Sequence, residues 1–139
     1  MANVTTYNPK QVTMASGSHI VTGYAEDSFI TVEPMGNGTS SKVGCDGEVV
    51  RSIDPDGRFS VKITVLQNSP TNAYLQQVYD KDRTTGDEIQ PLLVKDIKGN
   101  TSFSADKAWV AKPMSFARGK EAGNVEWTLE CADGQLEMQ

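Results

Sequence analysis

Hydrophobic and polar residues alternate at every second position in two segments of the chain, and this period predicts β-strands with one buried face. In residues 61–65 the apolar positions are Val61, Ile63 and Val65. In residues 125–131 the side chains expected to face inward are Val125, Trp127, Leu129 and Cys131. The solvent-facing side of the same strands is expected to carry Lys62, Thr64, Glu126, Thr128 and Glu130.

Shorter patterns predict further strands. Residues 11–14 and 20–24 flank the turn-like segment ASGS and predict a first hairpin. Residues 46–53 and 58–66 flank the segment DPDG, whose proline and glycine are typical of a type I turn, so they predict a second hairpin. Other strands are expected at residues 28–33, 91–97 and 101–111, and the strand at residues 125–131 is expected to be the last.

One helix interrupts the strands, at residues 69–82. Ser69 followed by Pro70 is typical of a helix start, because the hydroxyl caps the first turn and proline lacks an N–H that would have no partner there. Tyr74, Leu75 and Val78, together with Tyr79, then fall on one helical face. The expected fold class is mainly β, a two-sheet β-sandwich or barrel with one flanking α-helix, in a single domain of residues 1–139.

Glycine and hydroxyl residues dominate the segment PMGNGTSSKVG, residues 34–44. This composition predicts a long flexible loop. Loops of about a dozen residues in compact domains are usually functional or disordered. The segment is therefore a candidate for contacts made outside the subunit.

Charge and composition narrow the function. The chain has 139 residues and a net charge of −5, with 37% hydrophobic and 22% charged residues. This is the balance of a soluble globular protein, and a net acidic chain does not favour tight nucleic-acid binding. No apolar stretch approaches the roughly 20 residues of a membrane span, and the first residues do not resemble a secretory signal. No membrane association is expected.

Catalytic motifs are missing from the sequence. Its one histidine, His19, lies in a predicted turn, and the two cysteines, Cys45 and Cys131, are far apart and expected to stay reduced. No nucleophile elbow or phosphate loop occurs, and DPDG lacks the later ligands of a calcium loop. We expect no enzyme, no cofactor and no metal. Trp109 and Trp127 are expected in the core, with a subunit interface as the alternative for one of them.

A set of ordered segments resembles the tail-tube proteins of contractile-tailed phages and related prophages. These segments are YNPKQV, VTGYAEDSFITVE, GCDGEVVRS, VKITVLQNSPTNAYL, PLLVKDIKG, SADKAWVAKP and EWTLECADGQLEM. They extend over nearly the whole chain in the order of the family, and the glycine-rich segment and RTTGDEIQ depart from it. The resemblance also implies a fold similar to that of type VI secretion tube proteins.

The resemblance implies a structural virion protein whose hexameric rings stack into the inner tail tube, assembled in the host cytoplasm and located in the virion tail. Its implied partners are further copies of the chain, the sheath protein, the tape-measure protein and the baseplate proteins that initiate the tube, while DNA passes through the lumen without specific binding. In such proteins a long loop or hairpin reaches the adjacent ring, for which the candidates here are Asn37, Gly38, Thr39, Ser40 and Ser41. Lumen-facing candidates are Lys62, Thr64, Glu126 and Glu130, and Thr128 marks a strand expected to pair with a neighbouring subunit.

A second function class remains open from the sequence. The same β-sandwich could serve as a monomeric binding module, or as an accessory virion or baseplate protein. The two classes differ in assembly, since a tube protein forms rings and tubes and a binding module does not.

Overall fold

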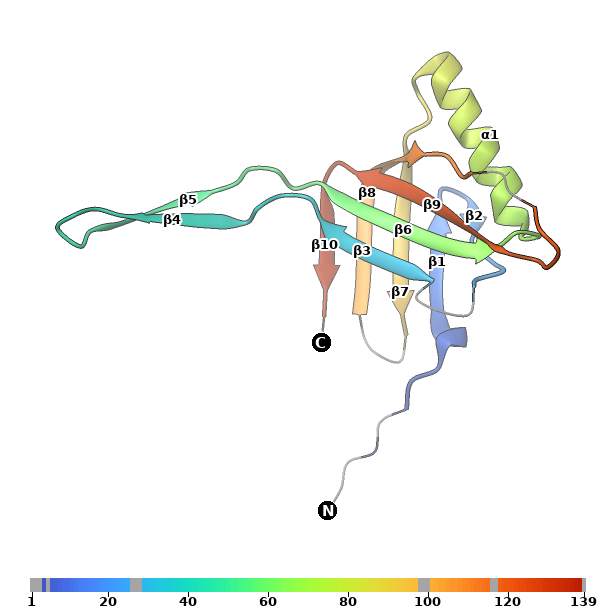
Figure 1. Cartoon of the computed structure of the whole chain (residues 1–139), viewed down its shortest axis with the longest axis horizontal. Coiled ribbons are helices and arrows are strands. Elements are labelled where there is room, and N and C mark those ends of the chain that lie inside the picture. Colours follow the sequence, from blue (N-terminus) through green and yellow to red (C-terminus); the bar gives the residue numbers. More distant parts are fainter. Residues whose placement is uncertain (1–3, 5, 26–28, 98–100, 116–117, 139) are drawn as a thin grey trace.

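The computed structural model describes residues 4, 6–25, 29–97, 101–115 and 118–138. The elements labelled in Figure 1 are η1 (Pro9–Gln11), β1 (Val12–Ser16), β2 (His19–Ile20), β3 (Ile30–Pro34), β4 (Thr39–Val43), β5 (Val49–Ile53), β6 (Phe59–Leu66), α1 (Pro70–Thr85), β7 (Gln90–Asp96), β8 (Thr101–Lys112), β9 (Asn124–Cys131) and β10 (Gly134–Glu137). Within these residues α1 is the only α-helix, as the sequence predicted, and it is not long and apolar enough to cross a membrane.

Eight strands form one antiparallel sheet in the order β2-β1-β7-β8-β9-β6-β3, with β10 beside β8. The 12-residue strand β8 belongs to both halves of this sheet, because its first part pairs with β7 and β10 and its last part pairs with β9. Figure 1 shows the result: β1, β7 and β10 run across the direction of β3, β6 and β9. The sheet thus folds over on itself into two layers, which confirms the expected mainly β, sandwich-like class.

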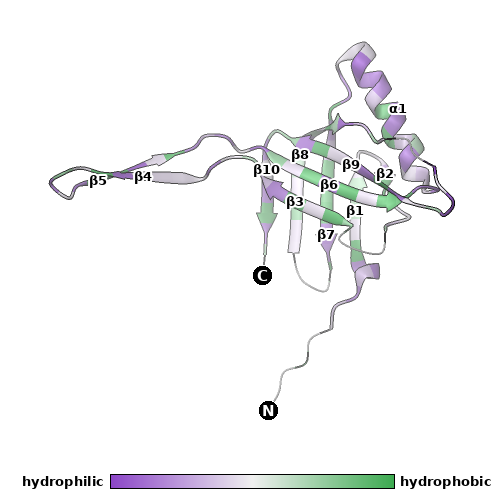
Figure 2. Ribbon diagram, in the orientation of Figure 1, coloured by the Kyte–Doolittle hydropathy of each residue, from purple (hydrophilic) through white to green (hydrophobic). Residues whose placement is uncertain are grey.

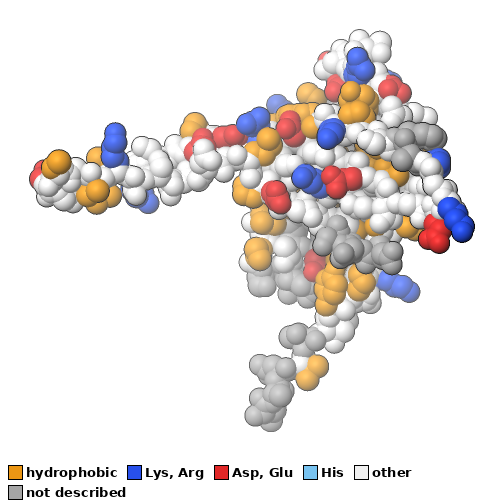
Figure 3. Space-filling view, viewed as in Figure 1, with side chains coloured by type: hydrophobic (Ala, Val, Ile, Leu, Met, Phe, Trp, Pro, Cys, Tyr) orange, Lys and Arg blue, Asp and Glu red, His pale blue; other side chains and the backbone are white. Residues whose placement is uncertain are grey.

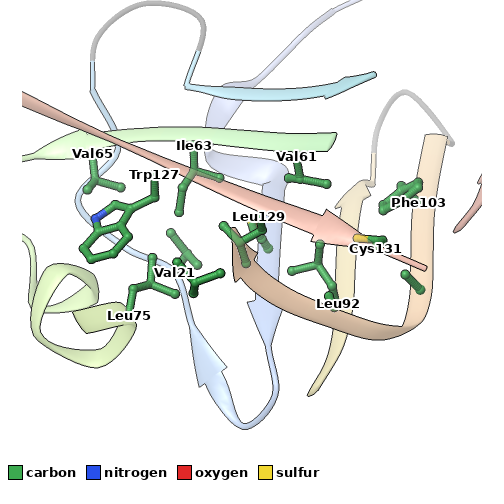
Figure 4. Close-up of a cluster of buried hydrophobic side chains, with 14 of the residues drawn as sticks. Val21, Val61, Ile63, Val65, Leu75, Leu92, Phe103, Trp127, Leu129 and Cys131 are labelled. Carbon is green, nitrogen blue, oxygen red and sulfur yellow. The ribbon is translucent and has the colours of Figure 1, made fainter. Parts of the chain in front are cut away.

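The core fills the space between the two layers (Figure 4). The layer of β6 and β9 contributes the alternating residues predicted from the sequence, all fully or nearly fully buried: Val61, Ile63, Val65, Val125, Trp127, Leu129 and Cys131. Figure 2 shows the matching alternation of hydrophobic and hydrophilic positions along both strands. Met14, Leu92 and Phe103 enter from the opposite layer. Burial of such side chains contributes about 1.5–3 kcal/mol each to the free energy of folding.

Helix α1 begins where the sequence predicted and ends three residues later. The hydroxyl of Ser69 accepts from the backbone N–H of Thr71, Pro70 follows, and Gly86 ends the helix with a left-handed φ of 74°. Leu75 is 1% exposed, and Tyr74, Val78 and Tyr79 pack against the core, so the predicted apolar face is confirmed.

Two predictions about the middle of the chain were wrong. Residues 39–43 do not form a loop but the strand β4, which pairs with β5 in a separate two-stranded sheet. Since β5 pairs with β4, the predicted hairpin across DPDG does not exist, and Asp54–Gly57 connects β5 to β6 instead. We call the β4–β5 hairpin, residues 39–53, the arm; it projects away from the body of the molecule (Figure 1). The sequence did not predict β4, because none of the side chains of this strand is buried and its residues therefore show no hydrophobic period.

The two ends of the sheet also differ in detail from the prediction. The first hairpin exists as β1 and β2, but its turn is shorter, because β1 continues to Ser16 and Gly17 takes a left-handed φ of 60°. Ser28, in the predicted third strand, lies outside the described residues. The strand β10 follows β9, so the prediction that β9 is the last strand was wrong. Its Leu136 is 47% exposed, so β10 also lacks a buried alternation.

Candidate functional site

The described residues contain no group of three or more His, Cys, Asp or Glu side chains placed to bind a metal ion. Cys45 is exposed in the turn of the arm, Cys131 is buried, and both are free thiols. Burial raises the pKa of the Cys131 thiol to about 11, which makes it a core side chain rather than a nucleophile.

His19 takes part in fastening the helix to the first hairpin. Its ring stacks on Tyr74 with centroids 4.4 Å apart, and its Nε2 lies 3.0 Å from the hydroxyl of Thr71. The hydroxyl of Tyr74 donates to the carbonyl of Ser16 or to the side chain of Gln90. Desolvation lowers the pKa of His19, which favours the neutral ring in the folded protein. This arrangement joins the helix to the first hairpin through contacts within one subunit.

All the lumen-facing candidates lie on one solvent-exposed face of the sheet. This face is formed by β3, β6, β9 and the last part of β8. Lys62 lies across from Thr128, Thr64 lies across from Glu126, and Ser60 lies across from Glu130. With Glu33 of β3 and Lys112 of β8 in the same register, this four-strand face carries three carboxylates and two ammonium groups, a net charge of −1. Figure 3 shows acidic and basic side chains intermixed on this side of the body.

Trp109 also lies on this four-strand face, across from Glu130, and is half-buried rather than part of the core. The prediction that Trp109 lies in the core was wrong, because the alternation of inward and outward side chains shifts within β8. Phe103 and Ala105 point inward at odd positions, whereas Ala108 and Val110 point inward at even positions. The shift occurs at the corner where β8 passes from one layer to the other, where its register with β7 is irregular. Trp127, in contrast, is 0% exposed, as expected.

Thr128 does not lie on a free strand edge. β6 pairs with one side of β9 and β8 pairs with the other side of residues 128–131, so the expectation that Thr128 lies at an edge open to a neighbour's sheet was wrong. Its side chain is half-buried on the four-strand face, next to Lys62.

The open edges of this half of the sheet are β3 and the end of β8. In β3 the N–H of Met35 donates to Arg58, and the carbonyl of Phe29 accepts from Thr64. Since bonded and non-bonded pairs alternate in antiparallel sheets, Ile30 and Val32 direct their backbone groups away from β6. Among the described residues, no strand pairs with that side of β3.

The opposite edge is open beyond Ala108, because β7 pairs with β8 only as far as the Gln90–Ala108 pair. The N–H of Ala132 donates to the carbonyl of Lys107, which places Trp109 and Glu130 in a bonded pair. By the same alternation Val110 directs its N–H away from β9. The four strands thus end in an open edge on each side.

The arm is the second surface feature, and its base is fixed by local hydrogen bonds. A carboxylate oxygen of Asp54 accepts from the N–H of Asn37 at 2.8 Å, and the N–H of Asp54 donates to the carbonyl of Gly38 at 2.8 Å. Donation from Asn37 and Asp56 lowers the pKa of Asp54. The inter-ring candidates Asn37 and Gly38 lie at this base, while Thr39, Ser40 and Ser41 lie in β4, and all five are exposed.

Comparisons with known sequences give a family match and a relative from a phage. Residues 6–138 match the family described as bacteriophage PhiTE tail tube protein. The chain is 31% identical over 132 residues to structural protein ORF10 of Pseudomonas phage KPP10, covering 89% of this chain and 76% of the relative.

Two solved structures share the fold. The tube terminating cap of the anti-feeding prophage has a TM-score of 0.58 at 10% identity and covers 100% of this chain and 95% of its own. The sheath/tube terminator of the extracellular contractile injection system PVC has a TM-score of 0.65 at 8% identity and covers 98% of this chain and 99% of its own.

Proposed function

The chain belongs to the bacteriophage PhiTE tail tube protein family and is a structural protein of a phage tail; from this premise we propose that its copies form hexameric rings that stack into the inner tail tube. Such a tube conducts DNA during infection. The observation that carries the proposal is the four-strand half-sheet with an open edge on each side.

The strand directions support ring closure. β3, β6, β9 and β8 alternate in direction, since each neighbouring pair is antiparallel. A rotation about a ring axis keeps each strand's direction along that axis, so the β3 edge of one copy meets the β8 edge of the next in antiparallel orientation. Six copies then close a continuous wall without open edges, which removes the hazard that open edges present.

The four-strand face with Lys62, Thr64, Glu126 and Glu130 then lines the lumen. Its net charge of −1 gives −6 per ring of six copies, whereas the whole chain at −5 gives −30. A wall with this weak negative charge offers DNA phosphates no basic stripe to bind, so DNA slides through without retention. The remaining negative charge faces other subunits and the outside of the tube.

The proposal assigns partners and place. The tape-measure protein occupies the lumen before DNA, a sheath protein surrounds the tube, and baseplate proteins initiate it, in a virion tail assembled in the host cytoplasm. Purified protein examined by mass photometry and negative-stain microscopy is expected to show rings or tubes. Only monomers at all concentrations would contradict the proposal and favour a binding module, and single rings that never stack would favour an accessory tail protein.

Placement of the lumen has a separate test. In tubes carrying Glu126→Lys and Glu130→Lys, the net charge of the wall rises by four per subunit, from −1 to +3, so duplex DNA is expected to be retained at low salt and released at high salt. A control with the same charge change carries Asp80→Lys and Asp87→Lys, two exposed positions on and after the helix. Tubes that form but retain no more DNA than the control would rule out this face as the lumen wall.

A further inference from the structure

Asn37, at the exposed base of the arm, is the only asparagine of the sequence that directly precedes a glycine. The side-chain amide of asparagine is chemically labile, and it is lost when the backbone nitrogen of the next residue reaches the Cγ atom. Glycine permits this approach most readily, because it has no Cβ and adopts backbone angles that other residues avoid. Gly38 has a φ of 74°, and nothing lies within 4 Å of the position that a Cβ would take there. The space around the two groups that would react is therefore open.

The hydrogen bonds at the base of the arm do not involve either of these groups. A carboxylate oxygen of Asp54 accepts from the backbone N–H of Asn37, and the N–H of Asp54 donates to the carbonyl of Gly38, each at 2.8 Å. Among the described residues, no hydrogen bond engages the side-chain amide of Asn37 or the N–H of Gly38. The amide can therefore rotate toward the glycine nitrogen without breaking a contact.

The other asparagines that the structure describes lack this combination of features. Asn8 precedes a proline, whose nitrogen carries no hydrogen. Asn72 is buried with its amide hydrogen-bonded, and Asn124 precedes a β-branched valine in β9. Asn68 is exposed, but the next N–H, that of Ser69, donates to a backbone carbonyl at 3.0 Å. Asn68 is therefore the natural internal control for Asn37.

We propose that Asn37 is a site of spontaneous deamidation, and that the products loosen the arm from the body. The nitrogen of Gly38 bonds to Cγ of Asn37 while the bond from Cγ to Nδ2 breaks, and the hydrogen lost from the glycine nitrogen leaves with Nδ2 as ammonia. Water then opens the resulting succinimide ring at either of its carbonyl groups. The products are aspartate and isoaspartate, and no atom is oxidised or reduced.

Both products change the base of the arm. Each places a new carboxylate on the residue whose N–H donates to the carboxylate of Asp54, and like charges so close together repel. Isoaspartate also inserts an extra carbon atom into the backbone between residues 37 and 38. The two hydrogen bonds of Asp54 depend on the native spacing there, since one reaches residue 37 and the other reaches residue 38. Isoaspartate is therefore expected to break one of them.

Site-resolved peptide mapping by mass spectrometry tests the modification. Purified protein is incubated in neutral buffer, and the loss of the amide is followed at Asn37 and at Asn68. Asn37 is expected to lose its amide first. The variant Asn37→Gln keeps an exposed amide before the glycine but would have to close a larger ring, so its amide is expected to remain. Loss at Asn68 as fast as at Asn37 would overturn the proposal.

Hydrogen exchange tests the effect on the arm. The N–H of Asp54 is bonded to the carbonyl of Gly38 in the native protein, so its exchange is expected to become faster after incubation. Fresh Asn37→Asp protein carries the new charge on a native backbone and is expected to show a smaller increase. Unchanged exchange at Asp54 in fully converted protein would overturn the loosening of the arm.

Tube formation measures the consequence for assembly, and this consequence rests on the proposed function. Incubated wild-type protein is expected to lose stacking into tubes, whereas Asn37→Gln protein incubated in the same way is expected to keep it. Converted protein that stacks normally would overturn the loosening of the arm, while tubes from fresh protein still support the proposed function. Fresh wild-type protein that never assembles would contradict the proposed function alone, because the peptide map decides the deamidation independently.

Discussion

At the scale of single residues, Asn72 joins three elements in one buried site. Its Oδ1 accepts from the indole Nε1–H of Trp127 at 2.9 Å, and its Nδ2 donates to the carbonyls of Leu66 and Gln67. Buried polar groups of this kind cost free energy when they lose their partners. The site ties the start of the helix to the strands of the four-strand face, so side-chain changes here act on the surface proposed for assembly.

Leu75 is the helix residue most dependent on packing. It is 1% exposed within the core cluster, so Leu75→Ala is expected to lower the free energy of unfolding by about 2–5 kcal/mol. Ala73→Ser, at an exposed position two residues away, provides a control that should change it by less than about 0.5 kcal/mol. Equilibrium denaturation in urea measures both. Equal midpoints for the two variants would contradict the assigned buried face.

His19 predicts a dependence of stability on pH. Its pKa is lowered in the folded protein, so folding disfavours the charged ring. The stability associated with the neutral ring is present above the unfolded pKa of about 6.5 and is lost as the pH falls through the lowered folded pKa. His19→Gln is expected to show a smaller loss of stability than the wild type between about pH 7 and pH 5. Denaturation at both pH values measures this, and parallel losses would contradict it.

At the scale of elements, the arm and the body have different sources of stability. Strands β6 and β9 each bury alternating residues in the core, whereas β4 and β5 bury none. The arm is therefore expected to contribute to assembly and not to the folding of the subunit. The backbone hydrogen bond from Asp54 to Gly38 marks the boundary between them.

Removal of the arm separates these two roles. When residues 39–53 are replaced by a two-residue Asn-Gly turn, the body is expected to keep its thermal midpoint within a few degrees, because the removed side chains contact nothing in the core. Rings are expected to form, but stacking into tubes is expected to fail. Electron microscopy and thermal unfolding measure the two outcomes. Tubes of normal length from this variant would contradict a role of the arm between rings.

At the scale of the whole molecule, the body resembles one segment of a larger wall. In the part of the chain that the structure describes, the sheet folds into two layers, but on the four-strand side it ends at β3 and at the end of β8 without closing. Open edges of this kind invite pairing with another chain. In the proposed ring each open edge pairs with the next copy, so the sheet becomes continuous only in the assembled ring.

A single N–H tests ring closure. Val32 directs its backbone N–H away from β6, so Val32→Pro removes a donor that pairs with no strand among the described residues. The variant is expected to fold with a thermal midpoint near that of Val32→Ala, which keeps the donor, but to form no rings. Mass photometry distinguishes rings from monomers. Rings of Val32→Pro at wild-type concentrations would exclude β3 as a contact edge.

The sequence by itself determined the parts of this protein whose burial repeats regularly. The period of two in residues 61–65 and 125–131 assigned inward and outward faces correctly, because each strand there is straight and half-buried. Ser69 and Pro70 marked the start of the helix through local backbone geometry, which needs no distant contact. The ordered resemblance gave the family, since it drew on nearly the whole chain.

The tertiary structure alone decided the features that depend on pairing partners. Strand β4 carries no burial signal, so its identity came from its register with β5. Trp109 lies outside the core because the inward-facing positions of β8 shift by one residue where the strand bends between the two layers. Thr128 does not lie at a strand edge because β6 and β8 pair with β9 on either side of it. Which strand edges stay open is a property of the order of strands in the sheet, and that order is set by contacts between residues far apart in sequence, which no local pattern contains.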